Sequence, residues 1–337
     1  MKLSEIGEFG LIEKIRGRKT AYDDDVVIGI GDDCAILRRG AILEALTTDC
    51  LVAGTHYENG WLSMRDVGWK VLAVNVSDVA AVGGTPRHAL VTLFLPDDVT
   101  TTDVDDLYDG MEECGAKYGV SIVGGDIVRI KGPFAVSVTL AGTCERDEVV
   151  LRSGARNEDI VVVTGSLGDA ALGMKCLKDG VEVGESGALY DAVKKFRRPE
   201  ARFAESRAIV QELRPSSMID VSDGLLSDVW HILESSKVGI MLDADLIPVS
   251  PGAIEFFKGG REEALSWALG SGEEYELLFT MAARMEAKLP ELSEKLGIKL
   301  TRIGKIVPKS SGVKMAGPEG EQDLKPGGFD HFKSEAF

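Results

Sequence analysis

The segment from Asp66 to Val82, DVGWKVLAVNVSDVAAV, limits the possible folds of this chain more than any other. It is apolar at helical spacing almost all the way round, which predicts a helix packed deep within a domain. The double glycine that follows, Gly83-Gly84, predicts the end of this helix. Burying such a helix requires a substantial core, and 337 residues, 44% of them apolar, are enough for two cores of about 150 residues each.

Short runs rich in valine and isoleucine alternate with helical patterns and predict buried strands. These runs are VVIGI from Val26, FAVSVTLAG from Phe134, DIVVVTG from Asp159 and YELLFT at 275–280. Helices are predicted at 193–213 and 283–296. We therefore expect an α/β (α+β) chain, and a polar, charged stretch before residue 160 predicts two domains, over residues 1–148 and 149–337.

Net charge and motif content exclude several classes of protein. A formal charge of -17, with basic residues scattered among acids, disfavours binding to nucleic acid. The N-terminus has no pattern of a secretory leader and no apolar run reaches the length of a membrane span, so we expect a cytoplasmic protein without a membrane partner. The five cysteines never occur at C-x-x-C spacing, which argues against a zinc site or a disulfide framework.

Nucleotide-binding signatures such as G-x-x-x-x-G-K-[ST] and a complete G-x-G-x-x-G are missing, so any nucleotide must be bound without a Walker loop. Instead, aspartates follow predicted strands, at turns where carboxylates from distant positions can converge on one edge of a sheet. Hard cations such as Mg²⁺ prefer such oxygen ligands. Each acid taken alone is more typical of a structural turn than of a metal ligand. The residues concerned are Asp33, Asp49, Asp126, Asp220 and Asp223.

Asp78 is more informative than these turn residues. On the predicted helix it shares a stripe with Val71 and Val74, so its carboxylate points inward and needs a cation or hydrogen-bond donors. A core aspartate satisfied by backbone amides is an equally good interpretation. Arg152 is placed to grip phosphate oxygens, although a solvated arginine is the default. The stretch TGSLGDAALG is typical either of a phosphate-cradling turn or of close helix–strand packing.

Taken in order, the motifs resemble those of the thiamine-monophosphate kinases, in the superfamily that includes aminoimidazole ribonucleotide synthetase and selenophosphate synthetase. They run nearly end to end and include GIGDDCAIL, TTDCLVAGTHY, GWKVLAVNVSDVAAVGGTP, IVGGD, VTGSLGDAALG, IDVSDGLLSD, SGEEYELLFT and GGFDHF. The resemblance implies a two-domain fold with mixed sheets flanked by helices, assembled as a homodimer. It also implies a kinase that uses ATP and several Mg²⁺ ions to convert thiamine monophosphate directly to thiamine diphosphate.

The resemblance further implies roles for individual residues. It assigns nucleotide contacts to Gly125, Asp126, Arg152 and Ser222, and substrate contacts to His56, Glu273 and Phe329. Within the metal site, Asp33, Asp126 and Asp220 are expected to act in catalysis through the bound metal. The implied metal ligands are Asp33, Thr47, Thr48, Asp49, Asp78, Asp126, Asp220 and Asp223.

Two stretches depart from the family pattern. Ser271 and Glu274 stand where the family usually has glycine and aspartate, and Ile127-Val128 stand where threonine-rich residues are usual. Alternatives to a thiamine-monophosphate kinase are another ATP-activating enzyme of the same superfamily, a non-catalytic nucleotide- or metal-binding protein on the same scaffold, and a metal-dependent phosphatase.

Overall fold

The structure, a computed structural model, describes residues 2–18, 22–318, 320–325, 327–329 and 331–332. The chain forms two compact units. The first contains the N-terminal part as far as Val149, the segment Arg197–Phe203, and His331 with Phe332. The second contains Val150–Phe196 and Ala204–Phe329.

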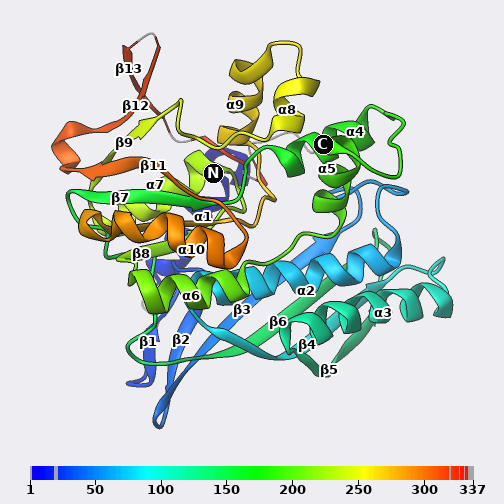
Figure 1. The fold of residues 1–337 in the computed structure, drawn as a ribbon. Coiled ribbons are helices and arrows are strands. Elements are labelled where there is room, and N and C mark those ends of the chain that lie inside the picture. Colours follow the sequence, from blue (N-terminus) through cyan, green and yellow to red (C-terminus); the bar gives the residue numbers. More distant parts are fainter. Residues whose placement is uncertain (1, 19–21, 319, 326, 330, 333–337) are drawn as a thin grey trace. The chain divides into compact units, whose positions relative to one another are not determined.

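The first unit is built on a six-stranded sheet in the order β1-β2-β3-β6-β4-β5 (Figure 1). Neighbouring strands are antiparallel except β4 and β5, which are parallel, so the sheet is mixed. Its elements are α1 (Leu3–Arg16), β1 (Val26–Ile28), β2 (Ala35–Arg39), β3 (Ile42–Val52), α2 (Met64–Ala81), β4 (Thr85–Leu95), α3 (Thr101–Tyr118), β5 (Ser121–Arg129) and β6 (Ala135–Cys144).

Helices α2 and α3 lie side by side against this sheet (Figure 1). They approach closely because each has a glycine at the crossing point: a Cβ on Gly68 would stand 1.9 Å from the Leu107 carbonyl oxygen, and one on Gly110 would stand 1.9 Å from that of Arg65. From Val67 onward, every residue of α2 is buried except Trp69 and Asp78, which are half-buried. The predicted deeply buried helix is confirmed, and it runs from Met64 to Ala81.

The second unit is built on a seven-stranded sheet in the order β13-β12-β9-β11-β7-β10-β8. Only the β12–β9 pair is parallel. The elements are β7 (Asp159–Thr164), α4 (Asp169–Lys178), α5 (Ala188–Arg197), α6 (Phe203–Leu213), β8 (Ser217–Asp220), α7 (Leu225–Ser236), β9 (Gly239–Asp243), α8 (Pro251–Phe256), α9 (Gly260–Gly270), β10 (Leu277–Ala282), α10 (Leu289–Leu296), β11 (Leu300–Val307), β12 (Val313–Gly317) and β13 (Gly320–Asp323), with 3₁₀ turns at Ala283–Lys288 and Lys309–Ser311.

The predicted mixed sheets flanked by helices are therefore confirmed, whereas several element boundaries were wrong. The helical region predicted at 193–213 is two helices, because Pro199 lies in the segment that separates α5 from α6. The helix predicted at 283–296 begins as a 3₁₀ turn and becomes α-helical only at Leu289. The strand expected from Tyr275 starts at Leu277, because Tyr275 has a left-handed backbone with φ 51°.

Three of the aspartates expected in turns lie in strands, and one of them, Asp220, is the last residue of β8. Asp49 is within β3 and Asp126 is within β5, because both strands continue their pairing through these positions. Asp33 does lie in the bend between β1 and β2, and Asp223 in the turn between β8 and α7. Among the helices in the described part of the chain, none is long and apolar enough to cross a membrane.

Candidate functional site

In the first unit, Asp78 of α2 faces strand β3. The hydroxyl of Thr47 donates a hydrogen bond of 2.5 Å to the Asp78 carboxylate. Carboxylate oxygens of Asp33 and Asp78 lie within 4.8 Å of each other, and Asp33 is only 8% exposed. Three side chains from separate parts of the sequence therefore present oxygen atoms to one small region.

Asp49 belongs to the same group. Burial raises the pKa of Asp49; a hydrogen bond with Asp78 opposes this effect, and the negative charges of Glu8 and Asp33 add to it. Crowded carboxylates of like charge are unfavourable unless they share a proton or a cation. Because all the donors are hard oxygen atoms, the group fits a divalent cation such as Mg²⁺. We call Asp33, Thr47, Asp49 and Asp78 the acid group of the first unit.

The remaining predicted ligands of this unit lie elsewhere on its sheet. Strand alternation turns the Thr48 side chain to the opposite face from Thr47, where its hydroxyl donates to the Val138 carbonyl at 3.1 Å. Gly125 and Asp126 lie on the exposed strand β5 at the edge of the sheet. Among the residues described, no contact joins Asp126 to the acid group.

His56 is held by a hydrogen bond of 3.0 Å from the Val52 amide to Nδ1. Burial lowers the pKa of His56 to about 4, and the charges of His331 and Lys70 contribute to the shift. Near neutral pH the ring is thus uncharged, with its proton on Nε2, which can donate to a substrate oxygen. Lys70 is fully buried and the His331 ring centroid lies 5.2 Å from that of His56. Sequence reasoning singled out neither Lys70 nor His331.

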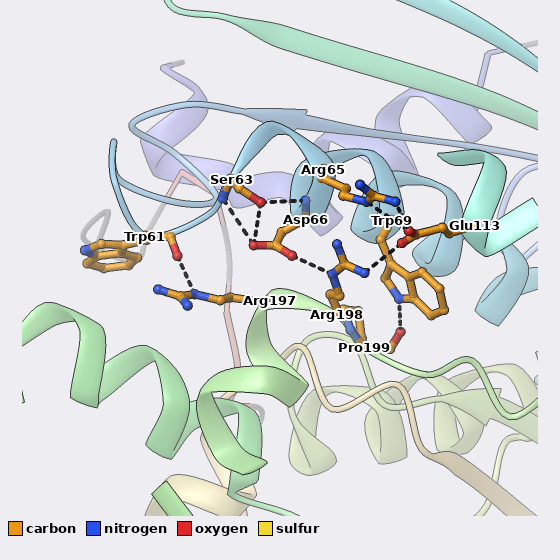
Figure 2. Close-up of polar contacts among 9 residues, drawn as sticks. All are labelled: Trp61, Ser63, Arg65, Asp66, Trp69, Glu113, Arg197, Arg198 and Pro199. Carbon is orange, nitrogen blue, oxygen red and sulfur yellow. Dashed lines mark hydrogen bonds and ion pairs between the residues drawn. The ribbon is translucent and has the colours of Figure 1, made fainter. Parts of the chain in front are cut away.

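The segment between α5 and α6 is anchored to the start of α2 (Figure 2). Arg198 pairs with Asp66 at 2.5 Å and with Glu113 of α3 at 2.9 Å. The indole nitrogen of Trp69 donates to the Pro199 carbonyl at 2.8 Å, and Arg198 lies 5.7 Å from the centre of the Trp69 ring. The helix that carries Asp78 is thus fixed at its first turns by ion pairs and an aromatic contact.

Asp66 also caps α2. The Ser63 hydroxyl accepts from the Asp66 amide while the Asp66 carboxylate accepts from the Ser63 amide, which completes a capping box (Figure 2). Burial would raise the pKa of Asp66, but hydrogen bonds from Arg198 and Ser63 lower it below its usual value. Asp66 therefore carries a negative charge at the helix N-terminus, where the helix dipole favours it.

In the second unit, a loop after β8 brings together Asp220, Ser222 and Asp223. Asp220 ends the strand and is 2% exposed. The amides of Ser222 and Asp223 both donate to one carboxylate oxygen of Asp228, at 3.1 and 3.3 Å. The loop therefore has a fixed shape set by a buried acid in the first turn of α7.

Sequence reasoning did not single out Asp228 or His231. Oxygen or nitrogen atoms of Asp223, Asp228 and His231 lie within 4.8 Å of one another. Burial strongly raises the pKa of Asp228, and the charges of Asp223 and Asp220 raise it further while Arg152 opposes them. Arg152 is thus electrostatically close to this loop. Asp228 and His231 are three residues apart on α7, and this helical spacing was the signal in the sequence that could have placed them on one face of the helix.

Two predicted substrate residues attach to the same loop. The Glu273 amide donates to the Ser222 carbonyl at 2.7 Å, and the Phe329 amide donates to the Asp223 carbonyl at 3.0 Å. Both side chains are partly exposed. The loop that carries the predicted nucleotide and metal residues of this unit thus also holds the two residues predicted to meet the organic substrate.

The glycine-rich turn at the start of α4 is occupied by a protein side chain. One carboxylate oxygen of Glu274 accepts hydrogen bonds from the amides of Gly168 and Ala170, at 2.7 and 3.1 Å. Of the two interpretations of this turn, the structure favours packing over phosphate binding, because an anion already fills the N-terminus of the helix.

Comparison with known proteins identifies both halves of the chain. The model for the N-terminal domain of AIR synthase related proteins matches residues 31–144, and the model for the C-terminal domain of these proteins matches residues 156–315.

Individual relatives are similar over nearly their full length. The thiamine-monophosphate kinase of Bacillus subtilis (strain 168) is 33% identical over 329 residues, which cover 97% of this chain and 99% of the relative. That of Escherichia coli (strain K12) is 34% identical over 330 residues, covering 97% and 98%. A solved structure described as AaThiL complexed with AMPPCP and TMP superposes with a TM-score of 0.85 at 33% identity, covering 98% of this chain and 99% of that one.

Proposed function

The chain belongs to the thiamine-monophosphate kinase family of AIR synthase related proteins, and on this premise we propose that it transfers a phosphoryl group from ATP to thiamine monophosphate, giving ADP and thiamine diphosphate. The observation that carries the proposal is the placement of Asp78 on a deeply buried helix, where it accepts a hydrogen bond from Thr47 and lies within 4.8 Å of Asp33. The two relatives bear the name of this kinase, and the AaThiL structure contains AMPPCP and TMP.

Mg²⁺ is the metal that these donors fit best. In the first unit Asp33, Thr47, Asp49 and Asp78 would hold it, with the Thr47 hydroxyl also fixing the orientation of Asp78. In the second unit Asp220 and Asp223 would do so. We also propose Thr48 and Asp126 as ligands. Thr48 would bind the ion through its backbone, because its side chain faces away from that of Thr47. Bound Mg²⁺ would supply charge neutralisation between the two anionic substrates.

The acceptor group is the phosphate of thiamine monophosphate, and its second pKa is about 6. Near neutral pH this group is therefore largely dianionic and needs no general base. The protein's task is to align two anions in line. We propose that Arg152, Ser222, Gly125 and Asp126 contact the nucleotide. Direct transfer, without a phosphorylated enzyme, follows because no side chain has to act as the nucleophile.

On the acceptor side we propose three contacts. The neutral ring of His56 can donate from Nε2 to a phosphate oxygen. Glu273 can accept from an amino group or face a cationic ring, and Phe329 can stack on a planar ring. Residues 1–148 would bind ATP and Mg²⁺, and residues 149–337 would complete the nucleotide and substrate sites.

We further propose a homodimer that forms through strands β4 and β5. Large apolar side chains are exposed here, with Leu90 at 50%, Val123 at 59% and Ile127 at 68%. Large apolar side chains exposed on an edge strand and its neighbour favour association with a second protein surface. Gly125 and Asp126 lie on the same strand, so a partner copy would come close to the predicted nucleotide residues. We also propose that the reaction takes place in the cytoplasm.

One assay tests the proposed reaction. The protein is incubated with ATP, Mg²⁺ and thiamine monophosphate, and thiamine diphosphate and ADP are quantified by chromatography. We expect equal amounts of both products, strongly reduced by Asp126→Asn. ADP or phosphate release that does not depend on the acceptor would indicate a phosphatase, and a phosphoenzyme that forms and decays at the turnover rate would exclude direct transfer.

A further inference from the structure

A buried charge network lies beneath the loop that carries Asp220 and Ser222. The Lys195 ammonium stands 2.7 Å from a carboxylate oxygen of Glu274 and 3.2 Å from one of Glu276, and it donates to the Ser166 carbonyl at 3.1 Å. The side chains of Glu274 and Glu276 are 0% and 1% exposed. None of the three residues has a role in the proposed chemistry.

Every oxygen of the two glutamates has a defined contact. Glu274 caps α4 through the amides of Gly168 and Ala170 with one oxygen and pairs with Lys195 through the other. Glu276 accepts from the Thr164 hydroxyl at 2.6 Å, and Thr164 in turn accepts from the Leu277 amide at 2.9 Å. The network thus connects helix α4, helix α5 and strands β7 and β10.

The lysine is charged in this environment. Burial alone would lower the pKa of Lys195, but the negative charges of Glu274, Glu276 and Asp169 outweigh it and raise the pKa above that of a free lysine. Burial raises the pKa of Glu274, and the charge of Lys195 opposes that rise. Without the lysine, two carboxylates would remain buried side by side, an arrangement that proteins avoid by protonation or by moving one acid to solvent.

The two glutamates belong to a backbone segment in an unfavourable conformation, residues 271–276, which we call the strap. Glu273 and Tyr275, on either side of Glu274, have left-handed φ values of 68° and 51°. Residues with a Cβ adopt such angles at a cost and keep them only when their surroundings fix them. The strap pairs with the loop through Glu273 to Ser222 at 2.7 Å and Tyr275 to Val221 at 2.8 Å, both from amide to carbonyl.

We propose that Lys195 is a positioning residue for acceptor binding, which holds Glu274 and Glu276 and thereby fixes the strap with Glu273 and the loop at 220–223. The inference rests on the proposed function for the role of Glu273 in substrate binding. Lys195 is not a catalytic residue, because it contacts only the two glutamates and a backbone carbonyl among the interactions described.

The test compares Lys195→Met with Lys195→Arg and with Lys194→Met, which changes the exposed neighbouring lysine. Displacing groups near a reacting centre by about 1 Å costs on the order of 100-fold, so we expect Lys195→Met to raise the KM for thiamine monophosphate by about 10-fold or more. The KM for ATP should change less. Lys195→Arg, which keeps the charge, should recover much of the loss, and Lys194→Met should match the wild type.

Hydrogen–deuterium exchange of the ligand-free protein gives a readout that does not depend on activity. Lys195→Met should speed exchange in peptides that cover residues 271–276 and 220–224, because the amides of Glu273 and Tyr275 lose their fixed partners. A lower melting temperature with wild-type KM values and wild-type exchange in these peptides would overturn the proposal and leave Lys195 a purely structural residue.

The two proposals fail in different ways. If the wild type makes no thiamine diphosphate, the proposed function is wrong, and the exchange measurement still decides whether Lys195 fixes the strap. If Lys195→Met does not fold, Glu274→Gln takes its place, since it keeps an acceptor for Gly168 and Ala170 but removes the charge that faces Lys195. The same changes in exchange and KM are then expected, and their absence would contradict the proposal.

Discussion

Thr47 of strand β3 donates its hydroxyl proton to the carboxylate of Asp78 on helix α2, over 2.5 Å. The hydrogen bond fixes Asp78 beside Asp33 and Asp49, so that three acids crowd together in a partly buried part of the first unit. The sequence left two interpretations of Asp78 open, a core aspartate satisfied by donors or a cation ligand. The acids Asp33 and Asp49 lie beside it, and such crowding of like charges favours a shared cation.

Asp78→Asn should abolish most activity without unfolding the protein. The amide keeps the size of the side chain but removes the charge that a divalent cation requires, so we expect kcat/KM to fall by about 100-fold or more. Mg²⁺ should raise the melting temperature of the wild type, because it binds only the folded state, and should raise that of the variant much less. Steady-state kinetics and thermal melts with and without Mg²⁺ measure both effects.

Asp105→Asn is the matched control, since Asp105 is an exposed acid on α3 in the same unit. It should leave both the kinetics and the Mg²⁺-dependent melting shift unchanged. A variant Asp78→Asn that retains the full Mg²⁺ shift would show that Asp78 is a core aspartate and not a ligand.

Stability should depend on His56 in mildly acidic solution. The pKa of His56 is lowered from 6.5 to about 4, so between these values the unfolded chain binds a proton that the folded chain does not. The contribution of His56 to the free energy of unfolding is fully present above pH 6.5 and is lost as the pH falls toward 4. The loss is at most about 3 kcal/mol. His56→Asn should therefore flatten the pH dependence of the free energy of unfolding in this window.

Urea denaturation from pH 4 to pH 7.5 measures this difference, and wild type minus variant separates His56 from the carboxylates that titrate in the same range. His88→Asn, at an exposed position on β4, serves as the control. Parallel curves for wild type and His56→Asn would contradict the prediction.

Ile127→Asp should weaken self-association. Ile127 is 68% exposed on the edge strand β5, and a carboxylate buried at a dimer interface is costly. Sedimentation equilibrium or light scattering should show a dimer for the wild type and a larger monomer fraction for the variant. Leu246→Asp changes an apolar side chain that is 45% exposed in the second unit and should leave the dimer intact. A monomeric wild type would refute the homodimer.

Arg198→Met should destabilise the first unit, whereas Arg129→Met should not. Arg198 pairs with two acids on α2 and α3 and has a side chain that is 27% exposed (Figure 2). Its loss leaves Asp66 partly buried without its partner, which should cost about 1–2 kcal/mol. Arg129 and Asp97 are 78% and 71% exposed, so water screens their pairing. Chemical denaturation of both variants makes the comparison, and equal effects would contradict it.

Local patterns in the sequence were sufficient for much of the fold. The apolar repeat from Asp66 to Val82 predicted α2, and the runs from Val26, Phe134 and Asp159 predicted β1, β6 and β7. Turn residues were a weaker guide to structure, because Asp49 and Asp126 continue paired strands although a small residue precedes each of them. Pro199 divides the helix expected at 193–213, since its ring is compatible only with a helix start or a break.

The sequence by itself determined two α/β halves, the inward-facing carboxylate of Asp78 and a series of motifs sufficient to recognise the family. Only the tertiary structure decided which of these groups meet. Gly168 and Glu274 are 106 residues apart and Thr164 and Glu276 are 112 apart, yet they share one buried network around Lys195. Periodicity reports which face of an element is buried, whereas the partner of a buried polar group depends on how distant elements pack, and local sequence does not encode that choice.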